Sequence, residues 1–257
     1  MAWSAQQYVK FEDERTRPVR DLIARLPQVG ASHAVDLGCG PGNSTELLRD
    51  RFPDAIVTGV DNSPEMIAAA RARLPQTRFG LHDIATWSET AEPVDVILAN
   101  AAFQWVPDHA VLLPGLLGRL RPGGSLAVQM PDNLHEPAHV AMRAVAADSR
   151  WADRLAAAAR PVDGQHDAGW YFDVLSEAGA RVDIWRTIYH HRMAEVGGIV
   201  EWFKGSSLRP FLTALDEAEQ QAFVAAYQAA ITPAYPRRSD GSVLLPFPRL
   251  FFVATMP

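Results

Sequence analysis

The sequence has very little cysteine, no long apolar run and no excess of positive charge. Cys39 is the one cysteine among 257 residues, which excludes an internal disulfide and a cysteine-rich zinc site. A membrane-spanning helix needs roughly 18 consecutive apolar residues, and no such run occurs. Residues 1–20 carry charged side chains where a signal peptide would need an apolar segment. We therefore expect a cytoplasmic, untargeted protein.

The balance of charge narrows the range of partners. Lys and Arg number 24 against 30 Asp and Glu, a formal net charge of −6. An acidic chain does not attract the phosphates of a nucleic acid or an anionic membrane surface. Its 48% hydrophobic and 21% charged residues are ordinary for a folded chain. At roughly 150 residues per domain, the length favours a single domain over residues 1–257. Because the charge disfavours nucleic acids and membranes, we expect a small-molecule partner.

Short apolar strands alternate with helices in the first half of the chain. A first helix is expected over 16–26, with Thr16 as its cap and Pro18 in its first turn. Strands separated by helices imply a parallel sheet with helices on both faces. The expected strands cover 33–37, 56–60, 78–81, 94–99 and 125–130, and the expected helices 44–51, 64–74 and 112–120.

The second half is mainly helical. Helical segments are expected over about 136–170 and 196–232, the second broken by Gly205 and Pro210, and we interpret both as a lid inserted before the last strand. Strand-like runs over about 181–189 and 249–255 would close the sheet, the latter being apolar enough for a buried strand. The prediction is an α/β, Rossmann-like fold with a mostly parallel sheet and a cofactor-binding core over about 30–132.

A glycine-rich turn is expected between the first strand and its helix, where residues 35–43 read VDLGCGPGN. Glycines there let a ligand approach the backbone at the carboxyl edge of the sheet, where open α/β folds bind ligands. A dinucleotide fingerprint needs a third glycine where this chain has Asn43. Asp36, two residues before Gly38, would repel a pyrophosphate and favour a cation. S-adenosylmethionine, which carries an ammonium and a sulfonium, is such a ligand.

Two further acidic residues end the next strands. Asp61 follows the second strand, where an acidic side chain can accept hydrogen bonds from both ribose hydroxyls. Asp83 follows the third strand and could accept a hydrogen bond from an adenine amine, with Ile84 beside the ring. Each aspartate taken alone is more often a helix cap than a ligand.

The order and spacing of these motifs resemble the class I S-adenosylmethionine-dependent methyltransferases over about residues 34–130. Nearly the whole chain, except 148–169, is similar to the trans-aconitate 2-methyltransferase family. The resemblance rests on segments throughout the chain: 15–18, 36–45, 100–101, 104–105, 107–109, 128–133, 136–139, 175–179, 182–187, 208–210 and 247–251. It implies transfer of a methyl group to one carboxylate of trans-aconitate, giving a monomethyl ester and S-adenosylhomocysteine. The expected cofactor contacts are Asp36, Gly38, Gly40, Asn43, Asp61, Asn62, Met66, Asp83, Ile84, Asn100, Gln104 and Trp105.

Such a reaction needs no general base and no metal, because a carboxylate is already the nucleophile at neutral pH. Catalysis then consists of positioning, and no catalytic acid or base is predicted. Binding a trianion in an acidic protein requires local cations, for which arginine is best suited. Arg186 is the first candidate because strand alternation places it opposite Trp185, although any one arginine could be a surface charge. The expected substrate contacts are Arg186, Arg209, Arg15, Arg17 and Arg249, with His109, His139 and Tyr171; a helix-surface position is the alternative for both histidines.

Other functions stay open. A nicotinamide-dependent oxidoreductase would bind a pyrophosphate at the glycine turn, against which Asp36 and Asn43 argue. A non-catalytic S-adenosylmethionine-binding protein would tolerate loss of the arginines. Within the methyltransferases, another polycarboxylate, an amine or a phenol could be the acceptor. The oligomeric state is not predicted.

Overall fold

The computed structural model describes residues 12–27, 30–159 and 165–257, with only the backbone for 12–15. The chain forms two compact units. The first contains the described residues of 1–131, 162–187 and 249–257, and the second those of 132–161 and 188–248. The expected cofactor-binding core thus belongs to the first unit and the helical segment over 196–232 to the second.

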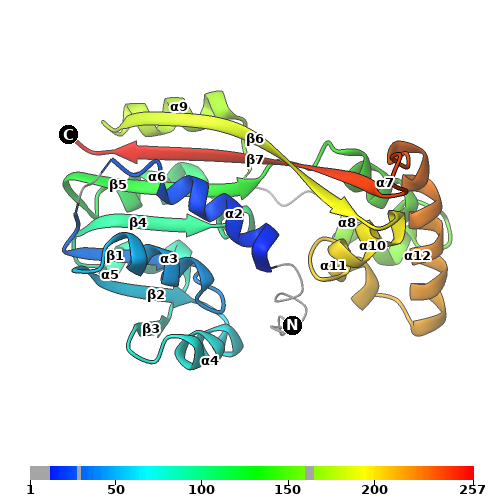
Figure 1. The fold of residues 1–257 in the computed structure, drawn as a ribbon, viewed down its shortest axis with the longest axis horizontal. Coiled ribbons are helices and arrows are strands. Elements are labelled where there is room, and N and C mark those ends of the chain that lie inside the picture. The colour runs from blue at the N-terminus through cyan, green and yellow to red at the C-terminus, as the bar shows by residue number, and fades with distance from the viewer. Residues whose placement is uncertain (1–11, 28–29, 160–164) are drawn as a thin grey trace. The chain divides into compact units, whose positions relative to one another are not determined.

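A seven-stranded sheet is the framework of the fold, in the order β3-β2-β1-β4-β5-β7-β6 (Figure 1). The strands β1 to β5 pair in parallel, and β7 is antiparallel to β5. The predicted α/β fold with a mostly parallel sheet is confirmed. The strands are β1 His33–Leu37, β2 Ile56–Asp61, β3 Arg78–Leu81, β4 Val94–Asn100, β5 Leu120–Pro131, β6 Arg181–Met193 and β7 Val243–Thr255.

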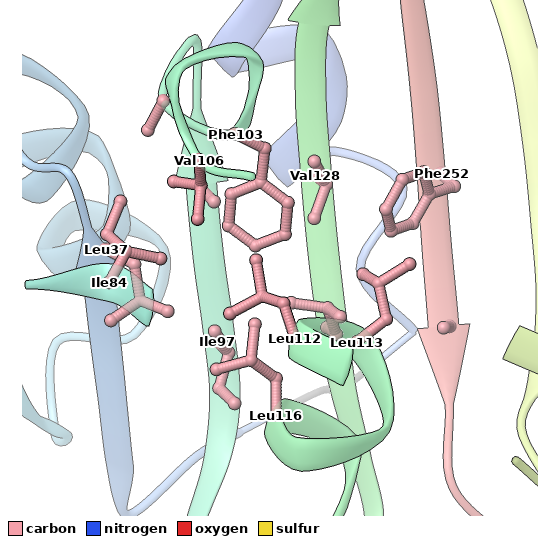
Figure 2. Close-up of a cluster of buried hydrophobic side chains, with 14 of the residues drawn as sticks. Leu37, Ile84, Ile97, Phe103, Val106, Leu112, Leu113, Leu116, Val128 and Phe252 are labelled. Carbon is pink, nitrogen blue, oxygen red and sulfur yellow. The ribbon is translucent and has the colours of Figure 1, made fainter. Parts of the chain in front are cut away.

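Helices of the first unit pack on the sheet, and one face is covered by a single large core. In this core Leu112, Leu113 and Leu116 of α6 lie against Ile97 of β4 and Val128 of β5 (Figure 2). Alternate strand residues point to the opposite face, because successive side chains along a strand point in opposite directions. The helical elements of this unit are α2 Glu12–Ile23, α3 Asn43–Arg51, α4 Pro64–Arg73, α5 Ile84–Thr90, η1 Phe103–Trp105, α6 His109–Leu117 and α9 Ala168–Glu177.

Helices dominate the second unit. Gly205 and Pro210 fall between or at the start of short helices, as predicted. None of the helices in the described part of the chain combines the length and the apolarity needed to cross a membrane. The elements are α7 Pro137–Ala146, α8 Ala152–Ala159, α10 Val196–Lys204, α11 Arg209–Thr213, α12 Glu217–Ile231 and η2 Thr232–Ala234.

Some element boundaries differ from those predicted. The first helix begins at Glu12, so Thr16 and Pro18 lie inside α2 and the predicted cap at Thr16 was wrong. Helix α6 ends at Leu117, with Gly118 as its C-cap, and β5 already begins at Leu120. The helix predicted to end at residue 120 therefore ends earlier, because Gly118 interrupts it before the Pro-Gly-Gly segment. The short helix α5 and the helix α9 were not predicted.

Candidate active site

The glycine turn connects β1 to α3 at the carboxyl edge of the parallel strands. Gly38, Gly40 and Gly42 all have positive φ, at 72°, 54° and 94°, the region that glycine adopts most easily. A Cβ at Gly38 would lie 2.4 Å from the Cβ of Ala102, whereas one at Gly40 would meet no described atom within 4 Å. Packing alone therefore demands a glycine at 38, and the backbone at 40 faces open space that a ligand can enter.

Asp36 holds the start of α3 from inside the sheet. Its side chain is fully buried, and Oδ2 accepts hydrogen bonds from Ser44 Oγ at 2.7 Å and Thr45 Oγ1 at 2.6 Å. Burial raises the pKa of Asp36 to about 6 against the opposing effect of the two hydroxyls, and the charge of Asp61 adds to the rise. The contact of Asp36 with a cationic ligand stays a prediction. The carboxylate is buried because two hydroxyls of α3 and the strand enclose it.

Asp61 ties the end of β2 to the glycine turn. Its Oδ2 accepts the Gly40 N–H at 2.9 Å and its Oδ1 accepts the Ser63 N–H at 2.9 Å. An ionised carboxylate has about four acceptor positions. Both oxygens can therefore accept further hydrogen bonds, as contact with two neighbouring ribose hydroxyls would require.

Asp83 and Ile84 follow β3 and begin α5. Asp83 is exposed and caps the helix, its Oδ1 accepting the Ala85 N–H at 2.9 Å. Ile84 is buried, and its Cδ1 would be 3.2 Å from a Cβ at Gly38. An apolar side chain thus lies directly beside the glycine turn.

The remaining expected contacts near these strands differ in exposure. Met66 is buried in α4, and Asn62 is exposed in the segment between β2 and α4. Asn43 is partly buried as the first residue of α3. Of these three, Asn62 presents the most accessible side chain to an incoming ligand.

The segment after β4 is strained and polar. Ala101 has a φ of 53°, a region that costs a residue with a Cβ about 1–3 kcal/mol and that is common at functional sites. The Gln104 side chain supports this conformation, its Nε2 donating to the Ala101 carbonyl at 2.6 Å. Trp105 is 47% exposed at the end of η1. The carboxyl end of β4 therefore presents a fixed backbone and a large, accessible aromatic surface.

Buried acceptors at this edge suit a ligand that is cationic and rich in donors. Among the described residues, Asp36 Oδ1, Asn100 Oδ1 and Gln104 Oε1 are buried without a hydrogen-bond partner. Buried acceptors are normally satisfied, and β1 and β4, which carry Asp36 and Asn100, are adjacent. The described residues contain no cluster of His, Cys, Asp or Glu suited to a metal ion. The residues present thus fit S-adenosylmethionine, whose ammonium can donate to such acceptors.

His109 and Tyr171 form a buried, hydrogen-bonded pair in the first unit. Neither side chain has exposed surface. His109 Nε2 lies 3.0 Å from the Phe103 carbonyl and so carries a proton, which leaves Nδ1 to accept from the Tyr171 hydroxyl at 2.7 Å. Burial lowers the pKa of His109. The alternative of a helix-surface position is therefore wrong for His109, because both ring nitrogens bond protein groups inside the core. Contact of His109 or Tyr171 with the substrate stays a prediction.

His139 is also internal. It lies on α7 of the second unit, 5% exposed, with Nε2 3.1 Å from Ser207 Oγ and its ring edge-on to Phe203. Burial lowers its pKa to about 4, and the charge of Arg143 acts in the same direction. The enclosed ring shows that the alternative of a helix-surface position is wrong for His139. Its contact with the substrate, through a neutral ring, stays a prediction.

The candidate arginines fall into exposed and buried positions. Arg186 is exposed on β6; as alternation predicted, Trp185 points to the opposite face, where it stacks on Phe251 at 5.0 Å. Arg249 is only 5% exposed, and its Nη1 donates to Gln129 Oε1 at 3.0 Å. The structure therefore makes Arg249 the most enclosed cation of the set. Of the others, Arg17 is exposed, Arg209 is partly buried at the start of α11, and the side chain of Arg15 lies outside the described residues.

Gln129 was not predicted as a site residue. It is fully buried on β5, opposite Asn100 of β4. A polar residue inside the apolar run over 126–130 was the signal that could have identified it, because buried strands rarely carry an amide without a partner for it.

Comparison with known proteins agrees with this geometry. A family model described as a methyltransferase domain matches residues 34–124. The YcgJ protein of Bacillus subtilis has a similar fold, with a TM-score of 0.62 at 11% identity over 93% of this chain and 98% of that one. The trans-aconitate 2-methyltransferase of Variovorax paradoxus is 53% identical over 98% of this chain and 97% of its own length. The protein of the same name from Methylobacterium radiotolerans is 54% identical, with the same coverage.

The sheet order and the match to a methyltransferase domain define a class I methyltransferase that depends on S-adenosylmethionine, as the sequence predicted. Identity above 50% over almost the full length of both chains narrows this class further. The chain belongs to the trans-aconitate 2-methyltransferase family.

Proposed function

We propose that the protein transfers the methyl group of S-adenosylmethionine to one carboxylate of trans-aconitate, giving a monomethyl ester and S-adenosylhomocysteine. The observation that carries the proposal is the 51–54% identity, over 97% or more of their length, to relatives that bear this name. The enclosed Arg249 supports it from the structure, since a polycarboxylate needs a cation that water does not screen. The action of the protein in the cytoplasm is part of the proposal, supported by its single cysteine.

The carboxyl edge of β1, β2 and β4 would hold the cofactor. Asp61 would accept from the ribose hydroxyls while it keeps the turn in place through Gly40. Asp83 and Ile84 would contact the adenine, and the buried acceptors of Asp36 and Asn100 would lie toward the cationic end. The other proposed contacts are Gly38, Asn43, Asn62, Met66, Gln104 and Trp105.

The chain's own part in the reaction would be to position the substrate. The bound cofactor supplies an electrophilic methyl group on a sulfonium. A carboxylate is ionised well below neutral pH and needs no proton removed before it attacks. Holding the reactants in line and in contact contributes up to about 7–11 kcal/mol in well-oriented systems. The fixed backbone at Ala101 and the ring of Trp105 would shape this contact.

Cations would select a substrate with several carboxylates. Arg249 is the first of them by burial, and Arg186, Arg209, Arg17 and Arg15 stay candidates for the remaining carboxylates. An arginine keeps its charge at every accessible pH and can bind a carboxylate with two parallel hydrogen bonds. Substrate affinity would therefore depend little on pH above the substrate's own pKa values.

A binding and transfer experiment tests the proposal. S-adenosylhomocysteine and a nicotinamide dinucleotide are titrated separately by calorimetry, and transfer from methyl-labelled S-adenosylmethionine is measured with trans-aconitate, cis-aconitate, citrate, isocitrate and a phenol. We expect that only S-adenosylhomocysteine binds and that kcat/KM is highest with trans-aconitate. Binding of the dinucleotide instead, or a phenol as the best acceptor, would contradict it. Cofactor binding without transfer to any acceptor would favour a non-catalytic binding protein.

A further inference from the structure

Gln129 and Arg249 form a polar pair inside the first unit. They lie on the antiparallel strands β5 and β7, where Arg249 is opposite Pro131 and Gln129 opposite Phe251. Gln129 has no exposed surface and Arg249 is 5% exposed. Burying a polar group is costly unless its hydrogen-bonding atoms are used, so the donors of the buried Gln129 amide call for an explanation.

The hydrogen bond within the pair fixes both side chains. Arg249 Nη1 donates to Gln129 Oε1 at 3.0 Å. This bond engages the amide oxygen, while the amide nitrogen of Gln129 has no partner among the described residues. An amide nitrogen is only a donor. A guanidinium and a buried N–H₂ group that has no partner among the described residues are thus held next to each other, and one anion can accept hydrogen bonds from both.

The pair adjoins the carboxyl edge of the parallel strands, where the cofactor is proposed to bind. Gln129 lies opposite Asn100, and its carbonyl accepts the N–H of the strained Ala101 at 2.8 Å. The next residue, Ala102, is the one that a Cβ at Gly38 would strike. A continuous run of contacts therefore leads from the glycine turn to the backbone of Gln129, all within the first unit.

We propose that Arg249 and Gln129 together bind one non-reacting carboxylate of the substrate. The guanidinium and the amide N–H₂ would donate to the same anion, while the Gln129 oxygen orients the guanidinium. This rests on the proposed function, which it deepens by naming a specificity-determining residue, Gln129. The pair selects an anionic group at a fixed distance from the transferred methyl, so an analogue lacking that carboxylate loses this contact.

The substitution Gln129→Glu separates recognition from folding. It keeps the size of the side chain and an acceptor for Arg249, removes the amide donors and places a negative charge where the substrate carboxylate would bind. We expect an unchanged melting temperature and unchanged affinity for S-adenosylhomocysteine. Affinity for trans-aconitate, titrated into enzyme saturated with S-adenosylhomocysteine so that no turnover occurs, should fall about 30-fold or more, and kcat/KM should fall alike.

Two further variants complete the test. Gln221→Glu adds the same charge at an exposed position of α12 and should leave binding and rate at parental values. Gln129→Met removes all polar atoms without adding charge and should weaken substrate binding less than Gln129→Glu. If both Gln129 variants instead lose cofactor affinity and melting temperature with substrate affinity, the pair is only structural and the inference is overturned.

A shortened substrate identifies the contact. The parent enzyme should prefer trans-aconitate over an unsaturated dicarboxylate of the same chain length, and Gln129→Glu should reduce this preference about tenfold or more. If Gln129→Glu keeps the parental preference for trans-aconitate, the inference is overturned. It is also overturned if both Gln129 variants bind trans-aconitate with parental affinity. In either case the proposed function stands. A parent enzyme that does not methylate trans-aconitate overturns the proposed function itself, a result that no Gln129 variant can produce.

Discussion

Replacing Asp36 with asparagine should make the protein more stable at neutral pH. The side chain is fully buried, and burial raises its pKa from 3.8 to about 6. At neutral pH the folded protein therefore holds an ionised carboxylate in an environment that disfavours its charge. Asparagine is nearly the same size, and its carbonyl can accept the hydrogen bonds that Ser44 and Thr45 now donate to Oδ2.

The size of the effect follows from the pKa. The pKa of Asp36 is higher in the folded than in the unfolded protein, so the folded protein binds the carboxyl proton more tightly. The stability contributed by this protonation is fully present below about pH 4 and is lost as pH rises through about 6. A rise from 3.8 to about 6 corresponds to about 3 kcal/mol. The free energy of unfolding of Asp36→Asn minus that of the parent should thus grow by up to about 3 kcal/mol between pH 4 and 7.

Urea unfolding of the cofactor-free protein at several pH values measures this difference. Asp95→Asn is a matched control, because the pKa of Asp95 is shifted in the opposite direction. Burial acts to raise the pKa of Asp95, but N–H groups of His33 and Ser32 and the guanidinium of Arg121 outweigh it and lower the pKa. Because both the folded and the unfolded protein hold Asp95 ionised above about pH 4, the difference between Asp95→Asn and the parent should stay nearly constant from pH 4 to 7 and change only at lower pH. A difference for Asp36→Asn that stays constant from pH 4 to 7 would refute the reasoning.

Three further predictions concern binding and rate. Asp61→Ala should weaken binding of S-adenosylhomocysteine, since hydrogen bonds to a charged acceptor contribute about 1.5–3 kcal/mol each; unchanged calorimetric affinity would remove Asp61 from the site. Gly38→Ala should lower the melting temperature, because its Cβ would lie 2.4 Å from the Cβ of Ala102. Gly40→Ala, whose Cβ would meet no described atom within 4 Å, should fold normally but bind S-adenosylhomocysteine weakly. Equal melting temperatures of the two variants would contradict the packing argument. With trans-aconitate, kcat should be nearly constant from about pH 6.5 to 8.5, and a slope of one through pH 7 to 8 would instead indicate an acceptor that must lose a proton.

The sequence predicted the parts of the fold that depend on local patterns. Apolar runs separated by helical segments predicted the parallel strands, and the glycines predicted the turn after β1, because strands and tight turns leave compact signals in the chain. Helix boundaries were less well predicted. Thr16, predicted as a cap, is buried inside α2, which begins at Glu12; a capping preference does not reveal such burial.

Side-chain environments were harder to predict than the fold. His109 resembles any histidine at the start of a surface helix, and only the three-dimensional structure shows its contacts with Phe103 and Tyr171. The pairing of Gln129 with Arg249 spans 120 residues and requires the antiparallel register of β5 and β7. Contacts of this kind arise from topology, which a single strand's pattern does not contain.

Identification of the product tests the central claim most directly. Purified enzyme is incubated with methyl-labelled S-adenosylmethionine and trans-aconitate, and the mixture is analysed by chromatography and mass spectrometry. The account predicts a labelled monomethyl ester of trans-aconitate that forms together with an equal amount of S-adenosylhomocysteine and is lost on mild alkaline hydrolysis. Enzyme that binds S-adenosylhomocysteine but forms no ester from trans-aconitate would contradict the account.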